Sequence, residues 1–277
     1  MSSFTKRILV TIVLVPLGMW CINLGGWALL LILLAFIAPA AWEYAQLYQA
    51  SGYRPITLLV VGGSVLLLMA RTWDGLYGTS YSLVAFNALI LISMAAHLID
   101  FERGREQAAA DFAITLTGFT YLGWIGSYLL MLRFLPSGQW WTFAVLPSVW
   151  LADAGGYFIG RRFGRRLLSP RLSPTKTWEG YFGGIVFAVG FGWLLGFAWQ
   201  AGAGANTPIS PLSCALIGLV MSILTVFGDL GESMIKRMSH AKDSGNLIPG
   251  HGGAFDRIDS WLWAGIIGFY LITWLWY

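Results

Sequence analysis

One polar stretch, Gly228 to Asp259, concentrates the groups of this sequence that could do chemistry. It reads GDLGESMIKRMSHAKDSGNLIPGHGGAFDRID and carries five carboxylates, four basic residues and two of the three histidines of the chain. Asp256 and Asp259 are three residues apart, so both would lie on one face of a helix that begins near them. Asp229 ends the preceding apolar run and could converge with them. Such carboxylates suit Mg²⁺, whose shell nucleotide phosphates and water would complete.

A simpler interpretation of the same aspartates is structural. Asp256 and Asp259 could cap the last helix and pair with nearby Lys or Arg side chains at the surface. The glycines Gly252 and Gly253 favour a binding site, because backbone without side chains approaches phosphate closely and offers its N–H groups. His251, directly before them, could be a metal ligand, a general base or a hydrogen-bond donor to phosphate.

A second stretch, SPTKTWEG at Ser173 to Gly180, is suited to holding phosphate. Ser173, Lys176 and Thr177 offer two hydroxyls and an ammonium group to anionic oxygens. The alternative is a loop that anchors the chain to anionic lipids. The arginines that precede this stretch fit the alternative better than catalysis; they are Arg161, Arg162, Arg165 and Arg166.

Asp153 lies inside an otherwise apolar run. A carboxylate in such a place is costly, so it is by default a candidate functional residue. Its glycine neighbours, Gly155, Gly156 and Gly160, could serve only to let helices pack closely.

Both polar stretches resemble motifs of a known family. Ser233 to Asp259 is similar to the signature of the bacterial phosphatidate cytidylyltransferases, or CDP-diacylglycerol synthases: S, KR, KD, a Pro or Gly, HGG, and DR followed by D. Every anchor is present: Ser233, Lys236, Arg237, Lys242, Asp243, Pro249, His251, Gly252, Gly253, Asp256, Arg257 and Asp259. Asp153 to Gly180 resembles an earlier block of the family, which ends here in SPTKTWEG at Ser173 to Gly180; the family usually has SPKKTWEG there, so Thr175 replaces a lysine.

The resemblance implies an enzyme of phospholipid biosynthesis that transfers the cytidylyl group of CTP to phosphatidic acid, giving CDP-diacylglycerol and pyrophosphate. It implies Mg²⁺, with room for a second cation, on Asp229, Asp256 and Asp259. Catalytic roles are implied for Lys236, Arg237, Lys242, Asp243, His251 and Arg257. Substrate contacts are implied for Asp153, Ser173, Lys176, Thr177, Glu179, Ser233, Gly252 and Gly253. The expected partners are CTP, phosphatidic acid, membrane lipids and a second copy of the chain.

Three other functions are compatible with parts of the sequence. In a secondary transporter, Asp153 and Asp229 would be coupling sites, but inverted-repeat hydropathy is missing and the polar loops fall on one side. An inactive lipid-binding protein would have little need of separate acids, bases and glycines. The third is an enzyme that uses CTP on another lipid, such as a polyprenol kinase or an archaeal-lipid cytidylyltransferase. The full HGG and DR-D signature favours the phosphatidate enzyme over these.

These motifs require an all-α, polytopic membrane scaffold to position them. Of 277 residues, 57% are hydrophobic and 11% charged, whereas soluble domains have about 25% charged residues. A membrane-spanning helix needs roughly 20 apolar residues. About nine runs qualify: Ile8 to Cys21, Trp27 to Trp42, Ile56 to Ala70, Tyr81 to Ile99, Phe112 to Phe134, Trp141 to Gly160, Tyr181 to Ala201, Leu212 to Phe227, and Trp261 to Tyr277.

The basic residues predict the orientation of these spans. With a cytoplasmic N-terminus, alternation puts the C-terminus on the opposite side and leaves only Arg71 and Arg133 of the 17 Lys and Arg outside. The formal net charge of +4 is therefore explained by the orientation of the spans and does not indicate nucleic-acid binding. We expect one multi-pass domain, 1–277, in the cytoplasmic (inner) membrane with its active site facing the cytoplasm. Residues 1–99 would form a scaffold or dimer contacts, and 100–277 would carry the site.

Overall fold

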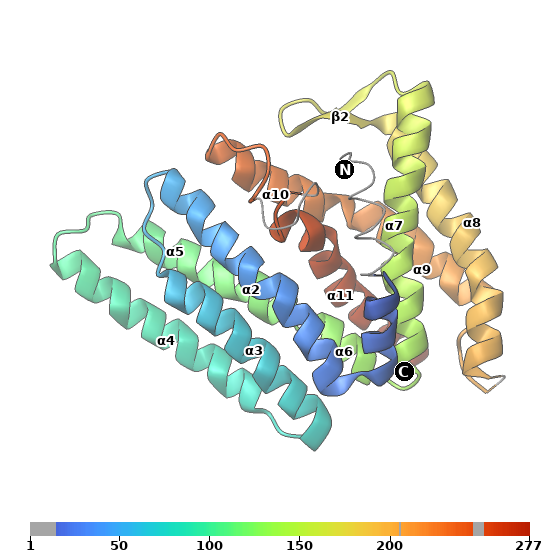
Figure 1. The fold of residues 1–277 in the computed structure, drawn as a ribbon, viewed down its shortest axis with the longest axis horizontal. Helices are drawn as coiled ribbons and strands as arrows, with labels where there is room; N and C mark the ends of the chain where they lie inside the picture. The colour runs from blue at the N-terminus through green and yellow to red at the C-terminus, as the bar shows by residue number, and fades with distance from the viewer. Residues whose placement is uncertain (1–14, 205, 246–251) are drawn as a thin grey trace. The chain divides into compact units, whose positions relative to one another are not determined.

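The computed structural model describes residues 15–204, 206–245 and 252–277, and nearly all of them are helical (Figure 1). Within these ranges, seven helices are long and apolar enough to cross a membrane. The prediction of a helical, multi-span membrane protein is confirmed. The number of nine spans and the orientation remain predictions, because the first predicted run, Ile8 to Cys21, lies partly outside the described residues.

The helices follow the apolar runs closely, since each run of about 20 apolar residues must satisfy its backbone hydrogen bonds internally within a bilayer. Their bounds are α2 Gly26–Ala50, α3 Thr57–Tyr77, α4 Tyr81–Glu102, α5 Ala108–Gly118, α6 Tyr128–Phe134, α7 Gly138–Phe163, α8 Trp178–Ala203, α9 Pro211–Leu224, α10 Val226–Met238 and α11 Phe255–Trp276. A short apolar helix, Val15–Leu24, precedes them. The strands β1 Leu167–Ser169 and β2 Ser173–Thr177 pair antiparallel.

The predicted span Phe112 to Phe134 is not one regular helix. It consists of α5, a π-helical segment η1 at Phe119–Ile125, and α6. A π-helical turn holds an extra residue, so it rotates the side chains that follow it relative to those before it. Hydrophobicity alone predicts the run but carries no signal for this interruption.

The chain divides into two compact units. The first unit takes in the described parts of 1–131 and 235–258, and the second takes in 132–234 and 259–277. In the first unit, α2, α3, α4 and α5 lie side by side (Figure 1). Leu67, Leu89 and Phe119 form a buried cluster there. The prediction of one membrane domain, with a scaffold part at 1–99 and a catalytic part at 100–277, remains a prediction.

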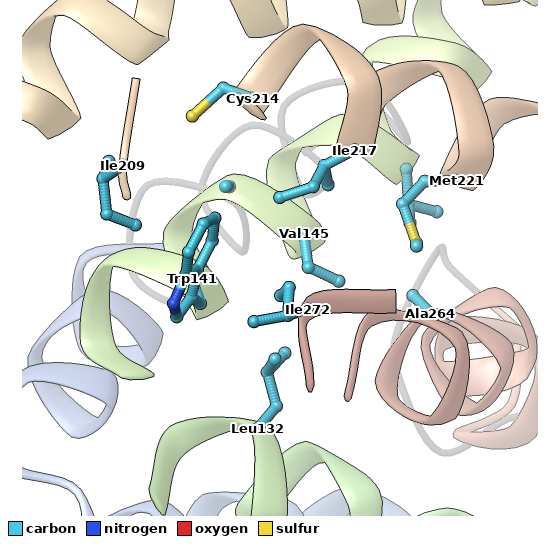
Figure 2. Packing of buried hydrophobic residues seen from close by; sticks show 11 residues of the cluster. Leu132, Trp141, Val145, Ile209, Cys214, Ile217, Met221, Ala264 and Ile272 are labelled. Atoms are coloured by element: carbon cyan, nitrogen blue, oxygen red, sulfur yellow. The ribbon is translucent and has the colours of Figure 1, made fainter. Parts of the chain in front are cut away.

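The second unit is built on the packing of α7 against α8 and of α8 against α9. Figure 2 shows its core, in which Trp141 and Val145 of α7 meet side chains from α9 and α11. The α9 and α11 residues of this core are Cys214, Ile217, Met221, Ala264 and Ile272. Cys214 and Cys21 are both buried and free, as expected for cysteines that act as small hydrophobic residues.

Candidate functional site

The hairpin β1–β2 is fixed to the start of α8 by two side chains of the SPTKTWEG motif. Thr177 caps the helix, and its hydroxyl accepts the Gly180 N–H at 3.2 Å. One oxygen of Glu179 accepts the N–H groups of Arg165, at 3.0 Å, and Arg166, at 3.2 Å. These bonds join the end of α7 to the start of α8. They leave Lys176, just before the cap, at a defined position.

A cavity of about 560 Å³ lies beside this hairpin, within the second unit. Its walls come from α7, the hairpin, α8 and the junction of α9 with α10. Three predicted substrate residues line it, namely Asp153, Lys176 and Thr177. Arg161 lines it too and donates a 2.8 Å hydrogen bond to the Tyr157 hydroxyl. An arginine for which the sequence favours lipid anchoring therefore also borders the cavity.

Lys176 connects the two sequence motifs that could do chemistry. Its ammonium group forms an ion pair with Asp229 of α10. The hydroxyl of Ser233, one turn further along α10, donates to Asp229 at 3.4 Å. Asp259 of α11 is buried, and the charges of Asp229, Asp153 and Lys176 all act on its carboxyl group. Four residues that the sequence singles out separately, Asp153, Lys176, Asp229 and Asp259, are thus brought together.

The charge of this group suits a cation. The charges of Asp153 and Asp229 both act on Asp259, Lys176 pairs with Asp229, and the ligand atoms of the three carboxylates are oxygens, which Mg²⁺ prefers. Among the described residues, no three His, Cys, Asp or Glu side chains lie close enough to hold a metal by themselves. Mg²⁺ commonly takes only one or two protein carboxylates and fills its remaining positions with substrate phosphates and water. The residues present therefore fit such a site, and the metal remains a prediction.

A second polar cluster, within the first unit, surrounds Asp256 at the start of α11. Lys236 donates to its Oδ1 at 2.5 Å. Its Oδ2 accepts the N–H groups of Gly253 and Ser244, each at 2.9 Å, and Ser244 Oγ lies at the same distance. Since both oxygens are engaged, Asp256 is held firmly in place. The N–H of Gly253 faces this carboxylate, so its proposed phosphate contact stays a prediction.

The remaining signature residues are more exposed. Lys242, Asp243, Arg237 and Arg257 present exposed side chains, and Arg237 donates to the Ala241 carbonyl at 3.1 Å. Ser173 begins β2 and is partly buried. Gly252 has a φ of 79°, a conformation that favours glycine. His251 lies outside the described residues.

Comparison with known proteins assigns the chain to a family. Residues 5–275 match the profile described as "Cytidylyltransferase family". The chain belongs to that family. Among its relatives, the phosphatidate cytidylyltransferase of Synechocystis sp. is 30% identical over 301 residues, which cover 97% of this chain and 96% of the relative. That of Pseudomonas aeruginosa is 33% identical over 293 residues, with 97% and 96% covered. That of Bacillus subtilis is 39% identical over 161 residues, with 58% and 57% covered.

In this member of the cytidylyltransferase family, the signature segment is contacted by Glu43, which the predicted site does not include, and its own Ser244 takes part in the contact. Glu43 of α2 accepts hydrogen bonds from Ser244, Ala254 and Phe255. The Ser244 N–H in turn donates to Asp256. Glu43 is one of few acids in the amino-terminal third, and this rarity was the only signal in the sequence. Its partners are about 200 residues away along the chain, so no local pattern could identify them.

Proposed function

We propose that the chain transfers the cytidylyl group of CTP to phosphatidic acid, producing CDP-diacylglycerol and pyrophosphate. The observation that carries the proposal is the cavity lined by Asp153, Lys176 and Thr177, next to Asp229 and Asp259, in a chain of the cytidylyltransferase family. The relatives named above carry the name phosphatidate cytidylyltransferase, and two of them match nearly the whole length of this chain.

The reaction balances as a displacement at phosphorus. A phosphate oxygen of phosphatidic acid attacks the α-phosphorus of CTP, a new P–O bond forms, and the bond to the β-phosphate oxygen breaks as pyrophosphate leaves. A phosphate monoester has a second pKa near 6, so its nucleophilic oxygen is already ionised at neutral pH. No strong base is required, and catalysis depends on bringing two anions together.

The residues of the chain address this repulsion directly. The Lys176 ammonium, on the cavity wall, would neutralise phosphate oxygens, and the Thr177 hydroxyl lies beside it. Arg161 at the same wall would attract the phosphatidate headgroup. When Lys176 turns from Asp229 toward a phosphate, the carboxylate of Asp229 becomes available to another cation.

Mg²⁺ is the cation that we propose for this position, with Asp229 and Asp259 as ligands and Asp256 as the third residue that the signature implies. Bound there, it would neutralise charge on the phosphate oxygens and so stabilise the developing transition state. A second cation is compatible with the acidic character of the site.

We further propose a cytoplasmic (inner) membrane location, nine spans and a site that faces the cytoplasm. The support is the distribution of Lys and Arg, which strongly favours one orientation. We also propose a homodimer through the amino-terminal helices. The support is the resemblance to the phosphatidate cytidylyltransferases, and the exposed apolar side chains of α4, such as Leu91, suit contact with lipid as well as with a second copy.

The proposal is tested in separate reactions that contain detergent-purified protein, radiolabelled CTP, Mg²⁺ and one lipid acceptor. We expect lipid-extractable label with phosphatidic acid and little with a polyprenol or an archaeal ether-lipid phosphate. With CTP labelled on its α-phosphate, label on the ether-lipid phosphate instead would reassign the substrate; with CTP labelled on its γ-phosphate, label on polyprenol would indicate a kinase. No label with any acceptor, from folded protein, would contradict cytidylyl transfer.

A further inference from the structure

Glu43 is a buried carboxylate in the carboxy-terminal part of the apolar helix α2. Only 3% of the residue is exposed. Burying a carboxylate is expensive unless hydrogen bonds compensate for the lost water. Glu43 accepts three, from the Ser244 hydroxyl at 2.8 Å and from the N–H groups of Ala254, at 3.0 Å, and Phe255, at 2.9 Å. This acid of α2 thus binds the signature segment on both sides of residues 246–251.

The same contacts lead directly to Asp256. Ser244 Oγ lies 2.8 Å from a Glu43 oxygen and 2.9 Å from Asp256 Oδ2. The Ser244 N–H also donates to Asp256 Oδ2, at 2.9 Å. A shift of the Glu43 carboxylate would therefore move Ser244, whose N–H donates to Asp256 and whose single hydroxyl proton lies between the two carboxylates.

Two glycines of the segment have no side chain where Glu43 lies, and so make room for its carboxylate. A Cβ atom added to Gly245 would lie 2.4 Å from Glu43 Oε1. One added to Gly253 would lie 2.4 Å from Glu43 Oε2 and 2.2 Å from Ser244 Oγ. The second glycine of the HGG motif is thus required here by a close approach of side chains to its backbone.

Aromatic packing next to Glu43 fixes the start of α11 as well. Phe255 is fully buried, with its ring 6.2 Å from that of Tyr44 and 6.4 Å from that of Tyr121. Tyr44 follows Glu43 on α2, and its hydroxyl donates to the Ile114 carbonyl. A hydrophobic contact therefore also anchors the start of α11, and this anchor does not depend on the Glu43 carboxylate.

We propose that Glu43 is a positioning residue, which sets the orientation of the Asp256 carboxylate through Ser244 and the backbone of the signature segment. This inference rests on the proposed function, in which Asp256 belongs to the metal set. Hydrogen-bond partners of metal ligands tune affinity or activity by about 10- to 100-fold. Loss of the Glu43 carboxylate should therefore weaken cation binding while the protein stays folded.

Glu43→Gln is the sharpest variant, because it keeps the size of the side chain and replaces one acceptor oxygen by an amide donor that faces other donors. We expect its dissociation constant for Mn²⁺, measured by EPR on purified protein without substrates, to rise about 10- to 100-fold. The Mg²⁺ concentration for half-maximal cytidylyl transfer should rise with it. Ser244→Ala, a milder change, should act in the same direction.

Asp111→Asn is the matched control. Asp111 is also a buried acid of the first unit, but its hydrogen bonds come from the Arg54 N–H, at 2.7 Å, and the Arg105 side chain rather than from the signature segment. It should lower the melting temperature without changing Mn²⁺ affinity. Unchanged Mn²⁺ affinity in both Glu43→Gln and Ser244→Ala would overturn the inference. Wild-type protein that makes lipid-linked label but binds no Mn²⁺ would overturn the metal set and this inference, and would leave the transferase activity standing.

Discussion

Two lysines of the predicted site each pair with a predicted metal ligand. Lys176 pairs with Asp229 in the second unit, and Lys236 pairs with Asp256 in the first. The Asp256 side chain is largely buried, where a carboxylate without a partner would be strongly destabilising, whereas the Asp229 side chain is partly exposed. The same ammonium groups are suited to phosphate, so in the proposed reaction the lysines would turn to phosphate oxygens and the proposed metal would take their place beside the aspartates.

Replacement of Lys176 by Ala tests this role at the level of one residue. Removing a preorganised charge that stabilises a transition state costs about 100-fold or more in turnover. We expect a loss of this size in kcat/KM for CTP, measured by steady-state kinetics with saturating phosphatidic acid. Lys242→Ala offers a comparison at an exposed signature lysine. Near wild-type kinetics for Lys176→Ala would remove it from the site.

Asp111 has a structural effect that depends on pH. Burial tends to raise the pKa of its carboxyl group, but hydrogen bonds from the Arg105 side chain and the Arg54 N–H outweigh it, so the pKa lies below the ordinary value. A group with a lowered pKa stabilises the fold above its unfolded pKa, about 3.9 for Asp, and this stability is lost as the pH falls through the folded pKa.

Asp111→Asn should therefore destabilise the protein most at neutral pH. We expect a loss of about 1–2 kcal/mol there, from weakened hydrogen bonds to a charged group. Thermal melts between pH 7 and pH 3 should show the difference from wild type shrinking below about pH 4. A constant difference across this range would contradict the assigned charge.

At the scale of helices, small residues set how closely α8 and α9 approach. A Cβ atom added to Gly218 of α9 would lie 2.4 Å from the Ala188 carbonyl oxygen of α8. Overpacking of this kind typically costs about 1–3 kcal/mol, so Gly218→Ala should lower the melting temperature. Gly190 of α8 has nothing within 4 Å of such an atom. Gly190→Ala should therefore be neutral or slightly stabilising, and equal effects of the two changes would refute the packing argument.

The sequence predicts helices better than it predicts the contacts between them. Seven of the predicted runs match helices long enough to span a membrane, because hydrophobicity over about 20 residues is a strong signal. The sequence also identifies Lys176 and Asp229 as candidate site residues, because they are charged residues beside apolar runs. It does not predict that they pair. The π-helical segment Phe119–Ile125 and the approach of Glu43 to the signature segment depend on tertiary packing, which no local pattern encodes.

At the scale of the whole molecule, the distribution of charge predicts the orientation in the membrane. The loop at Arg103 and the hairpin turn at Arg171 should face the cytoplasm, and the α3–α4 turn at Thr79 should face the opposite side. Single cysteines at these positions, in a variant without Cys21 and Cys214, can be labelled in intact cells with a membrane-impermeant maleimide. In intact cells we expect label at position 79 only. Label at position 171 before permeabilisation would show that the predicted orientation is wrong.

The central claim is that the acidic group around Lys176 supports cytidylyl transfer to phosphatidic acid. Asp259→Asn tests it most directly, because Asp259 is buried and interacts with Asp153, Asp229 and Lys176. The control is Asp74→Asn, which removes a carboxylate that accepts the Tyr81 and Ser82 N–H groups at the start of α4. Lipid-extractable label from radiolabelled CTP should be reduced at least about 100-fold in folded Asp259→Asn and retained in Asp74→Asn. Wild-type levels of label from folded Asp259→Asn would contradict the account.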